Sequence, residues 1–469
     1  MTSSSIEVLA SVDRYAGETL RRQIEDQLRR AIRSGTLKRG ARIASTRDLA
    51  RQLGVSRPVV VEAYAQLASE GYLEIRQGRV PRVSRCVGPC REAAVKPLAV
   101  TSGPNVDFRT RSPDLAAFPR GEWLRSVRNA LAKMPNEEFD YGDPRGTDAL
   151  RRALADYLGR VRGLVVDYEH IVIVNGYAQG RVLVCRALAA SGIKRVAIED
   201  PCQSSMPGAV KVAGLTIIPI PVDRDGIRVD VLERSDAEAV FLTPAHQFPT
   251  GAVMSGERRA AVLAWLRARK AIALEDDYDA EYRYDRAPVG ALQALEPARI
   301  IYGGTTSKTL APALRLGWLV VPPSLLEAVA REQRNADWGA SRIDQHAFAD
   351  FLERGELDRH LRRQRVVYRE RRDTLLRALD KFLPEATVVG ISAGLHATVG
   401  LPATDDERAI QEEASRRGIA IGVMRNNRVR PRGGVPTLLL GYANVSDASI
   451  RVGVKELASA VRATRSGPP

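Results

Sequence analysis

From about residue 104 onward, short runs rich in β-branched residues alternate with stretches of helical periodicity. The runs are HIVIVNG, KRVAIED, LTIIPIPVD, AVFLTP, AIALEDD, RIIYGG and GWLVVP, and RRAAVLAWLRARK is one of the helical stretches between them. Such alternation is typical of a mostly parallel sheet covered by helices. Long helices follow residue 322, and a smaller α+β segment begins near residue 385. The pattern predicts a large α/β domain over residues 104–469 with a smaller lobe at approximately 385–469.

The first 83 residues follow a different pattern, in which three short helices precede a hairpin. Residues 18–34 carry apolar side chains at four-residue steps, which predicts one buried helix face. These side chains are Leu20, Ile24, Leu28 and Ile32.

A second helix is predicted over TRDLARQLG, with Ser45 or Thr46 as its cap and Gly54 at its end. A third is predicted to begin at Ser56 as its cap and to run through VVVEAYAQLASEG, and GYLEIRQGRVPRVS predicts two short strands joined at a glycine. Helix, tight turn, helix and hairpin are together typical of a winged helix-turn-helix. We therefore predict that residues 1–83 form such a domain.

Positive charge is concentrated in this N-terminal segment. Residues 1–90 carry a net charge of +7, which is nearly half of the +15 of the whole chain. A compact basic module indicates a polyanion partner, and a helix start that reaches the major groove makes double-stranded DNA the predicted one. The residues predicted to contact DNA are Ser45, Thr46, Arg47, Ser56, Arg57, Gly78 and Arg79.

Residues 84–103 lack periodicity and contain Gly and Pro, so we predict a linker there. Cys86 and Cys90 have a CxxxC spacing, but no second ligand pair follows, and a solvated linker is favoured over a metal site. Four cysteines in 469 residues do not form a disulfide framework. No run approaches about 18 apolar residues, and the start lacks a basic flank before an apolar block. We therefore expect a cytoplasmic chain without a membrane span.

Polar residues follow several predicted strands at their carboxyl ends, where ligands bind in open parallel sheets. Asn175-Gly176 follows HIVIV and opens a helix whose first backbone N–H groups, at Tyr177, Ala178 and Gln179, suit a phosphate. EDDY at 275–278 follows AIAL, and TTSK at 305–308 follows RIIYGG. The acidic cluster taken alone could bind Mg²⁺ or cap a helix. GGTTSKT resembles a phosphate-binding Walker loop, but the chain has no glycine at either of the two positions where that loop requires one. A Walker loop is therefore excluded.

Taken together, these strand ends match the needs of pyridoxal phosphate. Its aldehyde requires a lysine for a Schiff base, and burial lowers that lysine's pKa enough for it to react. Its ring nitrogen requires a carboxylate, its phenolic oxygen a hydroxyl donor, and its phosphate an arginine, hydroxyls and a helix N-terminus. The chain supplies these groups at Lys308, Asp276, Tyr278, Arg315, Thr305, Ser307 and the Gly176 turn.

With these features, the chain resembles the MocR-type transcriptional regulators of the GntR superfamily, which join a winged helix-turn-helix to an aminotransferase-like domain of fold type I. The resemblance covers almost the whole chain. It rests on blocks that include STRDLARQLGVSR, YGDPRGTDALRRALADYL, LTPAHQFPTGAVMS, EDDYDAEYRYD and GTTSKTLAPALRLGWLVVP. It implies a regulator that binds the cofactor through the matched lysine and forms a head-to-tail homodimer. In that dimer the DNA-binding domain of one chain meets the large domain of the other.

The resemblance also implies individual roles. Lys308 is expected to carry the cofactor, Asp276 to contact the ring nitrogen and Tyr278 the phenolic oxygen. Asp277 and Asp279 are expected to be structural, and His246 in TPAHQFPTG is a further contact candidate.

The sequence departs from the family pattern at several positions. Ala44 replaces the proline before STR, and the wing reads Gly78-Arg79-Val80-Pro81 instead of GSGT followed by an aromatic residue. Where the family has EDPGY, with an aromatic residue that stacks on the cofactor, this chain has EDPCQ and ends the motif with Gln203. VPTLLLGYA lacks the arginine that would bind a substrate carboxylate. The nearby candidates are Arg428, Arg430 and Arg432.

Three hypotheses follow from these observations. The chain is a DNA-binding regulator that senses pyridoxal phosphate or an amine adduct of it, a working aminotransferase with a basic appendage, or a regulator whose cofactor site is only structural. The intact Lys308 and Asp276 argue against the third hypothesis. The altered stacking position and the missing carboxylate arginine argue against the second. We therefore expect negligible aminotransferase turnover.

Overall fold

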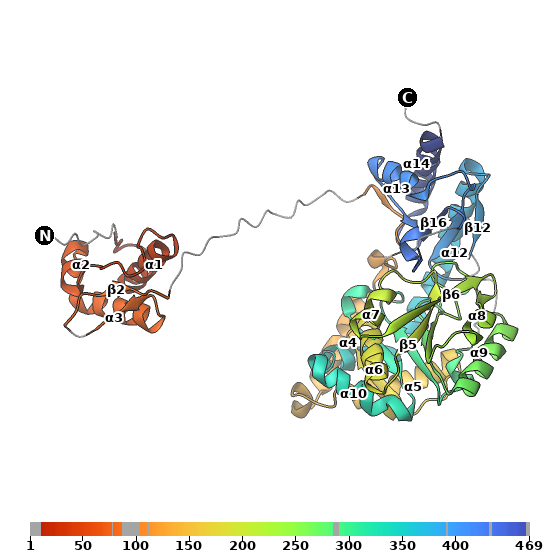
Figure 1. Cartoon of the computed structure of the whole chain (residues 1–469), viewed down its shortest axis with the longest axis horizontal. Helices are drawn as coiled ribbons and strands as arrows, with labels where there is room; N and C mark the ends of the chain where they lie inside the picture. The colour runs from red at the N-terminus through yellow and green to blue at the C-terminus, as the bar shows by residue number, and fades with distance from the viewer. Residues whose placement is uncertain are drawn as a thin grey trace. The chain divides into compact units, whose positions relative to one another are not determined.

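The computed structural model describes residues 11–76, 78–86, 104–110, 112–284, 290–390, 393–430 and 434–465. The chain divides into two compact units, Met1–Thr101 and Ser102–Pro469 (Figure 1). Most of the predicted linker, residues 87–103, lies outside the described residues. Within the described ranges, no helix combines the length and the apolar composition needed to cross a lipid bilayer.

The N-terminal unit contains three helices and a two-stranded antiparallel sheet. Their bounds are α1 Leu20–Arg33, α2 Thr46–Leu53, α3 Arg57–Ser69, β1 Leu73–Glu74 and β2 Arg82–Val83. The predicted four-residue stripe is buried at Ile24, Leu28 and Ile32, which pack with α2, α3 and the sheet in one apolar cluster. Gly54 ends α2 in the left-handed conformation, with φ +64°.

The cap of α3 differs from the prediction. Ser56 occupies the N-cap position, but its side chain makes no capping hydrogen bond. Pro58 has no N–H to donate, and the N–H of Val59 donates instead to the backbone oxygen of Ser56. The Ser56 hydroxyl is therefore not used to cap the helix.

The second unit is built on an eight-stranded mixed sheet in the order β4-β11-β10-β9-β8-β5-β6-β7. The strands are β4 Ile171–Val174, β5 Arg195–Asp200, β6 Thr216–Asp223, β7 Gly226–Ile227, β8 Ala239–Leu242, β9 Ile272–Asp276, β10 Ile300–Thr305 and β11 Gly317–Val320. Strands β10, β9, β8, β5 and β6 run parallel, whereas β11 runs antiparallel to both of its neighbours and β7 runs antiparallel to β6. The sheet is thus mostly parallel, as predicted.

Helices cover both faces of this sheet because successive strand residues alternate between the faces. On β4, Val172 and Val174 pack with the helices of one face, whereas Ile171 and Ile173 pack with those of the other. The first face carries α6 Tyr177–Ala190, α7 Met206–Val212 and α10 Pro323–Asp337. The second face carries α5 Asp148–Arg162, α8 Val229–Glu233, α9 Gly256–Arg269 and α11 Arg342–Glu353, and α4 Arg120–Lys133 packs on α11.

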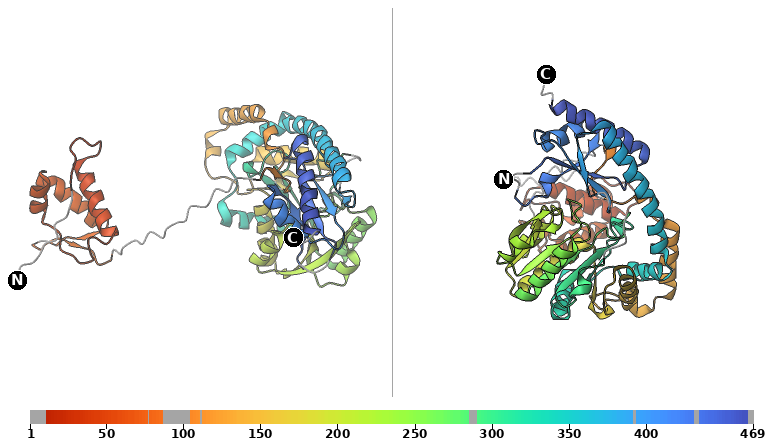
Figure 2. Two further views of the ribbon diagram at one scale, coloured as in Figure 1. Left: turned by 90° about the horizontal axis from the view of Figure 1, so that it is seen from above. Right: turned by 90° about the vertical axis from the view of Figure 1, so that its right-hand side faces the viewer.

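A smaller lobe is attached through the long helix α12, Glu356–Phe382, which runs along the side of the unit (Figure 2). Its four-stranded antiparallel sheet has the order β12-β13-β16-β15. Its elements are β12 Thr387–Val389, β13 His396–Gly400, α13 Glu407–Arg416, β15 Gly422–Val423, β16 Thr437–Gly441 and α14 Asp447–Arg465, and β14 Ile419–Ala420 pairs with β3 Val106–Asp107. The long helices after residue 322 and the α+β lobe after residue 385 agree with the sequence prediction.

Candidate functional site

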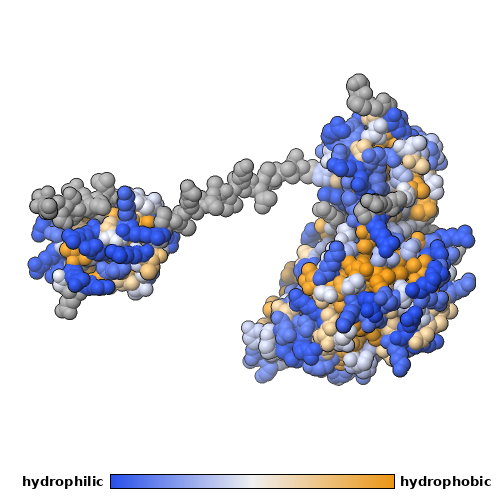
Figure 3. All heavy atoms as spheres, viewed as in Figure 1, coloured by the Kyte–Doolittle hydropathy of each residue, from blue (hydrophilic) through white to orange (hydrophobic). Residues whose placement is uncertain are grey.

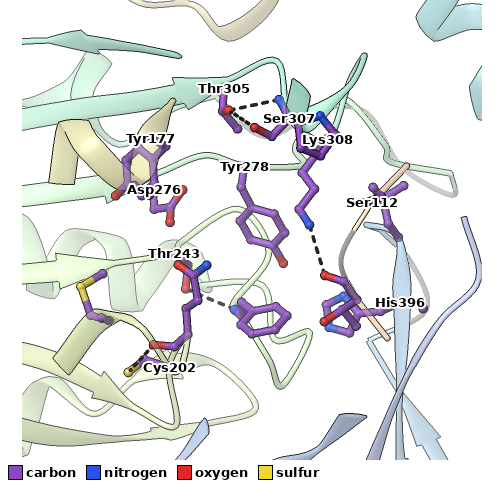
Figure 4. Close-up of a pocket in the computed structure, with 18 of the residues that line it drawn as sticks. Ser112, Tyr177, Cys202, Thr243, Asp276, Tyr278, Thr305, Ser307, Lys308 and His396 are labelled. Atoms are coloured by element: carbon purple, nitrogen blue, oxygen red, sulfur yellow. Dashed lines mark hydrogen bonds between the residues drawn. The ribbon is translucent and has the colours of Figure 1, made fainter. Parts of the chain in front are cut away.

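A cavity of about 240 Å³ lies at the carboxyl ends of the central strands, between the sheet and the smaller lobe. Eight of the predicted cofactor residues line it, as Figure 4 shows for several of them. These eight are Tyr177, Ala178, Asp276, Tyr278, Thr305, Ser307, Lys308 and Arg315. The remaining walls are mainly apolar and include Ile198, Met206, Phe241, Phe248 and Leu395.

Lys308 enters the cavity from the turn that follows β10. Its Nζ donates a hydrogen bond to the backbone oxygen of Thr110 at 3.2 Å. Burial lowers the pKa of Lys308, and the nearby carboxylates of Asp279 and Asp276 only partly oppose that effect. A lysine with a lowered pKa has a larger fraction of neutral amine, which is the form that attacks a carbonyl carbon.

Asp276 is the last residue of β9 and faces the cavity from the side opposite the smaller lobe (Figure 4). Its Oδ1 atom is buried and has no hydrogen-bond partner among the described residues. Burial raises the pKa of Asp276 to about 8, and the charge of Arg181 partly offsets this effect. A buried carboxyl with an unused oxygen fits a protonated ring nitrogen, which would supply both the missing N–H donor and a compensating charge.

Tyr278 crosses the middle of the cavity (Figure 4). Burial and then the charges of Asp279 and Asp276 raise the pKa of its hydroxyl well above the ordinary value. The hydroxyl therefore stays protonated and can donate a hydrogen bond.

Small polar groups and an arginine lie at the end of the cavity next to the start of α6. Thr305 Oγ1 lies 3.0 Å from Ser307 Oγ and accepts the Ser307 N–H at 3.1 Å. Arg315 Nη2 donates to the backbone oxygen of Asn175 at 2.7 Å, and the guanidinium lies directly over Gly176. A Cβ at Gly176 would lie 3.2 Å from Arg315 Nη1, and the residue has φ +79°, so both space and backbone conformation favour glycine. Because α6 has no side-chain cap, the N–H groups of Tyr177 and Ala178 remain available to a phosphate, whereas the Gln179 N–H donates to the Gly176 oxygen at 3.0 Å.

Three predicted cofactor residues do not line the cavity. Gly176 lies under Arg315, as described above. The Gln179 side chain accepts the Asn175 N–H at 2.6 Å and donates to Asp337, so it turns away from the cavity. His246 lies behind Tyr278, with Nδ1 3.0 Å from the Tyr278 hydroxyl. Asp277 lies apart from them in a buried ion pair with Arg162.

Two arginines near the cavity were not singled out from the sequence. Arg181 is buried on α6, where it donates to Gln203 Oε1 at 2.7 Å and to Ser205 Oγ at 2.9 Å. Its position four residues after Tyr177, on the same helix face, could have indicated it. Arg109 lines the cavity, but Asp107 holds its guanidinium through two hydrogen bonds.

The candidate carboxylate arginines lie elsewhere. Arg428 and Arg430 line a second cavity with residues of β6, including Ile218 and Pro221. Neither belongs to the lining of the cavity that contains Lys308. Arg432 lies outside the described residues.

In the N-terminal unit, most of the predicted DNA contacts are exposed at the start of a helix or at the hairpin turn. Arg47, Ser56, Arg57, Gly78 and Arg79 are exposed, and Thr46 is half-buried. The visible face of this unit is largely hydrophilic (Figure 3).

Ser45 is the exception among these residues because its hydroxyl has a structural role. It donates to Asp48 Oδ2 at 2.6 Å and accepts the Asp48 N–H at 3.3 Å as the cap of α2. The structure therefore assigns Ser45 to the helix start, next to the exposed Arg47.

Both units match known protein families. Residues 20–83 match the bacterial regulatory proteins of the gntR family, and residues 117–457 match aminotransferase class I and II. The chain is 31% identical to the "Probable rhizopine catabolism regulatory protein MocR" of Rhizobium meliloti, over 97% of this chain and 96% of that protein. It is 33% identical to the "HTH-type pyridoxine biosynthesis transcriptional regulator PdxR" of Corynebacterium glutamicum, over 80% of this chain and 82% of that protein.

Solved aminotransferases share the fold of the second unit. The multiple substrate aminotransferase of Thermococcus profundus superposes with a TM-score of 0.72 at 26% identity, covering 78% of this chain and 93% of that one. An archaeal alanine:glyoxylate aminotransferase gives a TM-score of 0.70 at 28% identity, with 76% and 91% coverage. The second unit therefore has the pyridoxal-phosphate-dependent transferase fold of type I.

Proposed function

We propose that this chain, which belongs to the MocR-type transcriptional regulators, binds pyridoxal phosphate in its second unit and uses it to control DNA binding. Regulators of this type join a GntR-type helix-turn-helix to an aminotransferase class I and II domain. One observation carries the cofactor part of the proposal. Lys308 and the unpartnered Oδ1 of Asp276 face the same cavity. Burial lowers the pKa of Lys308 and raises the pKa of Asp276, so it favours the neutral form of both groups. Two neutralised groups of this kind in one cavity are typical of a functional site.

Each residue then has a defined task. When bound, pyridoxal phosphate supplies an aldehyde that couples reversibly to primary amines. Lys308 would hold that carbon through its amine, and Asp276 would accept the hydrogen of the ring nitrogen. Tyr278 would donate to the phenolic oxygen. Thr305, Ser307, Arg315 and the start of α6 would bind the phosphate, while the apolar walls exclude water.

The N-terminal unit would bind double-stranded DNA through the starts of α2 and α3. We propose that Arg47 and Arg57 contact phosphates or base edges, with Ser56 and Thr46 as supporting donors. Gly78 and Arg79 would reach the DNA from the turn between β1 and β2. The operator would be read by two such units of a head-to-tail homodimer, the assembly that the family resemblance suggests.

Exposed apolar residues of the second unit support a homodimer. Leu124 and Leu131 lie seven residues apart on α4, so they share one face, and they are 58% and 48% exposed. The rings of Tyr141 and Trp338 contact each other in a tilted arrangement, with 5.8 Å between centroids and 57° between planes, although Tyr141 is 82% exposed. Exposed apolar side chains that share a helix face, or that contact one another as these rings do, form small apolar patches of the kind found in protein–protein interfaces.

The effector is proposed to be pyridoxal phosphate or an amine that reacts with it at Lys308. Such a ligand changes the affinity for DNA only if the regulator has two arrangements of its DNA-binding units and these bind the ligand with different affinity. An aminotransferase with a basic appendage is the alternative, and it would need a carboxylate-binding arginine in the cavity. The one lining arginine outside the phosphate site, among the described residues, is Arg109, which Asp107 already holds.

The test is an absorbance scan of the purified full-length chain with pyridoxal phosphate, followed by borohydride reduction. We expect a visible band in the wild type, and after reduction a cofactor mass on the peptide that contains Lys308. Lys308→Ala should lose the band but remain folded, because the substitution removes a buried amine. Lys455→Ala, at an exposed lysine of α14, is the matched control and should keep the band. A band that persists in Lys308→Ala would place the aldehyde on another lysine and contradict this site.

A further inference from the structure

A buried polar pair lies directly behind Tyr278. His246 follows β8 and Asp279 follows β9, and their side chains are 1% and 2% exposed. His246 Nδ1 lies 2.9 Å from Asp279 Oδ2 and 3.0 Å from the hydroxyl oxygen of Tyr278. A single ring nitrogen therefore has two oxygen neighbours at hydrogen-bond distance.

The chemistry of these atoms determines where the hydrogens lie. A carboxylate only accepts hydrogen bonds, so the favourable form of His246 carries its hydrogen on Nδ1 and donates it to Asp279. The other ring nitrogen, Nε2, is buried and has no hydrogen-bond partner among the described residues. A hydrogen on Nε2 would thus be buried without an acceptor, and the Nδ1 lone pair would face the Asp279 carboxylate.

This arrangement restricts the Tyr278 hydroxyl. Because Nδ1 already carries a hydrogen, it cannot accept one from Tyr278, and the phenol oxygen can only act as a second acceptor of that hydrogen. The phenol is thereby fixed in place, and its own hydrogen is shared between Asp279, whose hydrogen bonding helps to raise the Tyr278 pKa, and any acceptor that enters the cavity. Tyr278 lines the cavity, whereas His246 does not, so an acceptor can approach the hydroxyl from the cavity side.

The smaller lobe holds the pair in place. A Cβ at Gly394 would lie 2.2 Å from His246 Cε1 and 2.6 Å from Asp279 Oδ2, so the chain at Gly394 packs directly against both side chains. The hydroxyls of Tyr284 and Tyr442 donate to the Gly394 oxygen at 2.8 Å each and fix this close approach. The His246 ring has little room to turn or to exchange its two nitrogens.

On this basis, and given the proposed cofactor site, we propose that His246, held by Asp279, is a positioning residue that directs the hydroxyl hydrogen of Tyr278 toward the phenolic oxygen of the bound cofactor. His246 itself does not touch the cofactor. The nearest ionisable groups around the Tyr278–His246 contact are Asp279, Asp276 and Glu199 from the strand ends, His396 from the smaller lobe, and Lys308. Of these groups, Asp279 and then Asp276 act most strongly on the Tyr278 hydroxyl through their charges, and Asp279 also hydrogen-bonds to it.

The proposal predicts a measurable pH effect. A hydrogen bond to the phenolic oxygen favours negative charge there, and that charge is greatest once the neighbouring nitrogen on Lys308 has lost its proton. The Tyr278 donor therefore lowers the pH midpoint at which the visible band of the lysine-bound cofactor changes. Loss of a hydrogen bond to a charged group should raise this midpoint by about one to two pH units.

The test compares His246→Asn, His246→Gln and His246→Phe in the full-length chain loaded with pyridoxal phosphate. The asparagine amide places an N–H donor near the position of Nδ1, whereas the glutamine amide reaches the position of Nε2 and phenylalanine has no donor. We expect a near wild-type midpoint for His246→Asn and an upward shift for the other two variants. The shift should equal that of Tyr278→Phe, and the double variant Tyr278→Phe/His246→Phe should show no further shift.

Asp279→Asn gives a second route that preserves the shape of the site. It weakens the acceptor that orients His246, so the midpoint should move in the same direction by a smaller amount. Wild-type midpoints in His246→Gln and His246→Phe, with a shifted midpoint in Tyr278→Phe, would overturn the role of His246. A wild-type chain with no visible band, or a band that survives in Lys308→Ala, would instead overturn the proposed cofactor site.

Discussion

At the scale of single residues, the central feature is a pair of buried groups with opposite ordinary charges in one cavity. Burial lowers the pKa of the Lys308 amine and raises the pKa of Asp276 to about 8. In the absence of a ligand, both shifts favour the neutral forms, so the site avoids a buried charge. A ligand that couples to the amine and presents an N–H to the carboxylate would allow Asp276 to ionise with a partner.

The raised pKa of Asp276 predicts a pH dependence of stability in the cofactor-free chain. Between about pH 4 and pH 8 the folded state keeps a proton on Asp276 that the unfolded state releases, so the free energy of unfolding falls as pH rises. Asp276→Asn cannot release this proton. Relative to the wild type, the variant should gain about 1–3 kcal/mol of stability between pH 6 and pH 8.5. Urea unfolding at both pH values measures this difference, and parallel pH profiles of the two proteins would contradict it.

The main residues that line the cavity could be predicted because they lie at or just after strand ends. Asp276 ends β9, Tyr278 lies just after it and Lys308 follows β10, and a parallel sheet brings such ends together. Arg181 was missed because its spacing from Tyr177 gives only the shared face of α6, whereas its contact with Gln203 depends on how α6 packs against a loop. The position of His246 behind Tyr278 likewise depends on how two loops pack.

At the scale of elements, the hydrophobic pattern predicted most helices and strands, because helices bury one stripe and the central strands bury both faces. The α1 stripe and the two-sided strand β4 are examples. Hydrogen bonding at element ends was harder to predict. The side chain of Ser56 leaves α3 uncapped since Pro58 has no N–H, whereas Ser45 caps α2 through Asp48.

The exposed starts of α2 and α3 predict the effect of two substitutions on DNA binding. Arg57→Ala should cost about 1–3 kcal/mol of operator affinity if it reads a base, and Arg47→Ala should weaken binding and reduce its salt dependence if it contacts a phosphate. Arg30→Ala, at an exposed arginine near the end of α1, is the control and should bind as the wild type does. Fluorescence anisotropy over a salt series measures both effects. Unchanged affinity in both variants would exclude these helix starts as the recognition surface.

At the scale of the whole molecule, the chain combines a GntR-type helix-turn-helix unit with a transferase fold whose sequence departs from the family pattern at the cavity. Transamination requires that the substrate be held with the reacting bond perpendicular to the ring, and loose placement loses much of the rate. Gln203, which stands in the sequence where the family pattern has an aromatic residue, lines the cavity and accepts a hydrogen bond from Arg181, and neither Arg428 nor Arg430 lines the cavity.

We therefore expect negligible turnover with amino acids or amines. An assay for keto-acid or aldehyde formation, with the full-length chain and added pyridoxal phosphate, measures this rate for a panel of amino donors. Sustained multiple turnover with any of them would favour the aminotransferase alternative.

Control of DNA binding by the cofactor is measured directly as operator affinity across a titration with pyridoxal phosphate. The operator would first be located by footprinting upstream of the neighbouring gene, and affinity would then be measured for the wild type, Lys308→Ala and the control Lys455→Ala. We predict that the cofactor changes the operator Kd about fivefold or more in the wild type and in Lys455→Ala, and leaves it unchanged in Lys308→Ala. An operator affinity in the wild type that is the same with and without the cofactor would contradict the claim that the second unit controls DNA binding through this site.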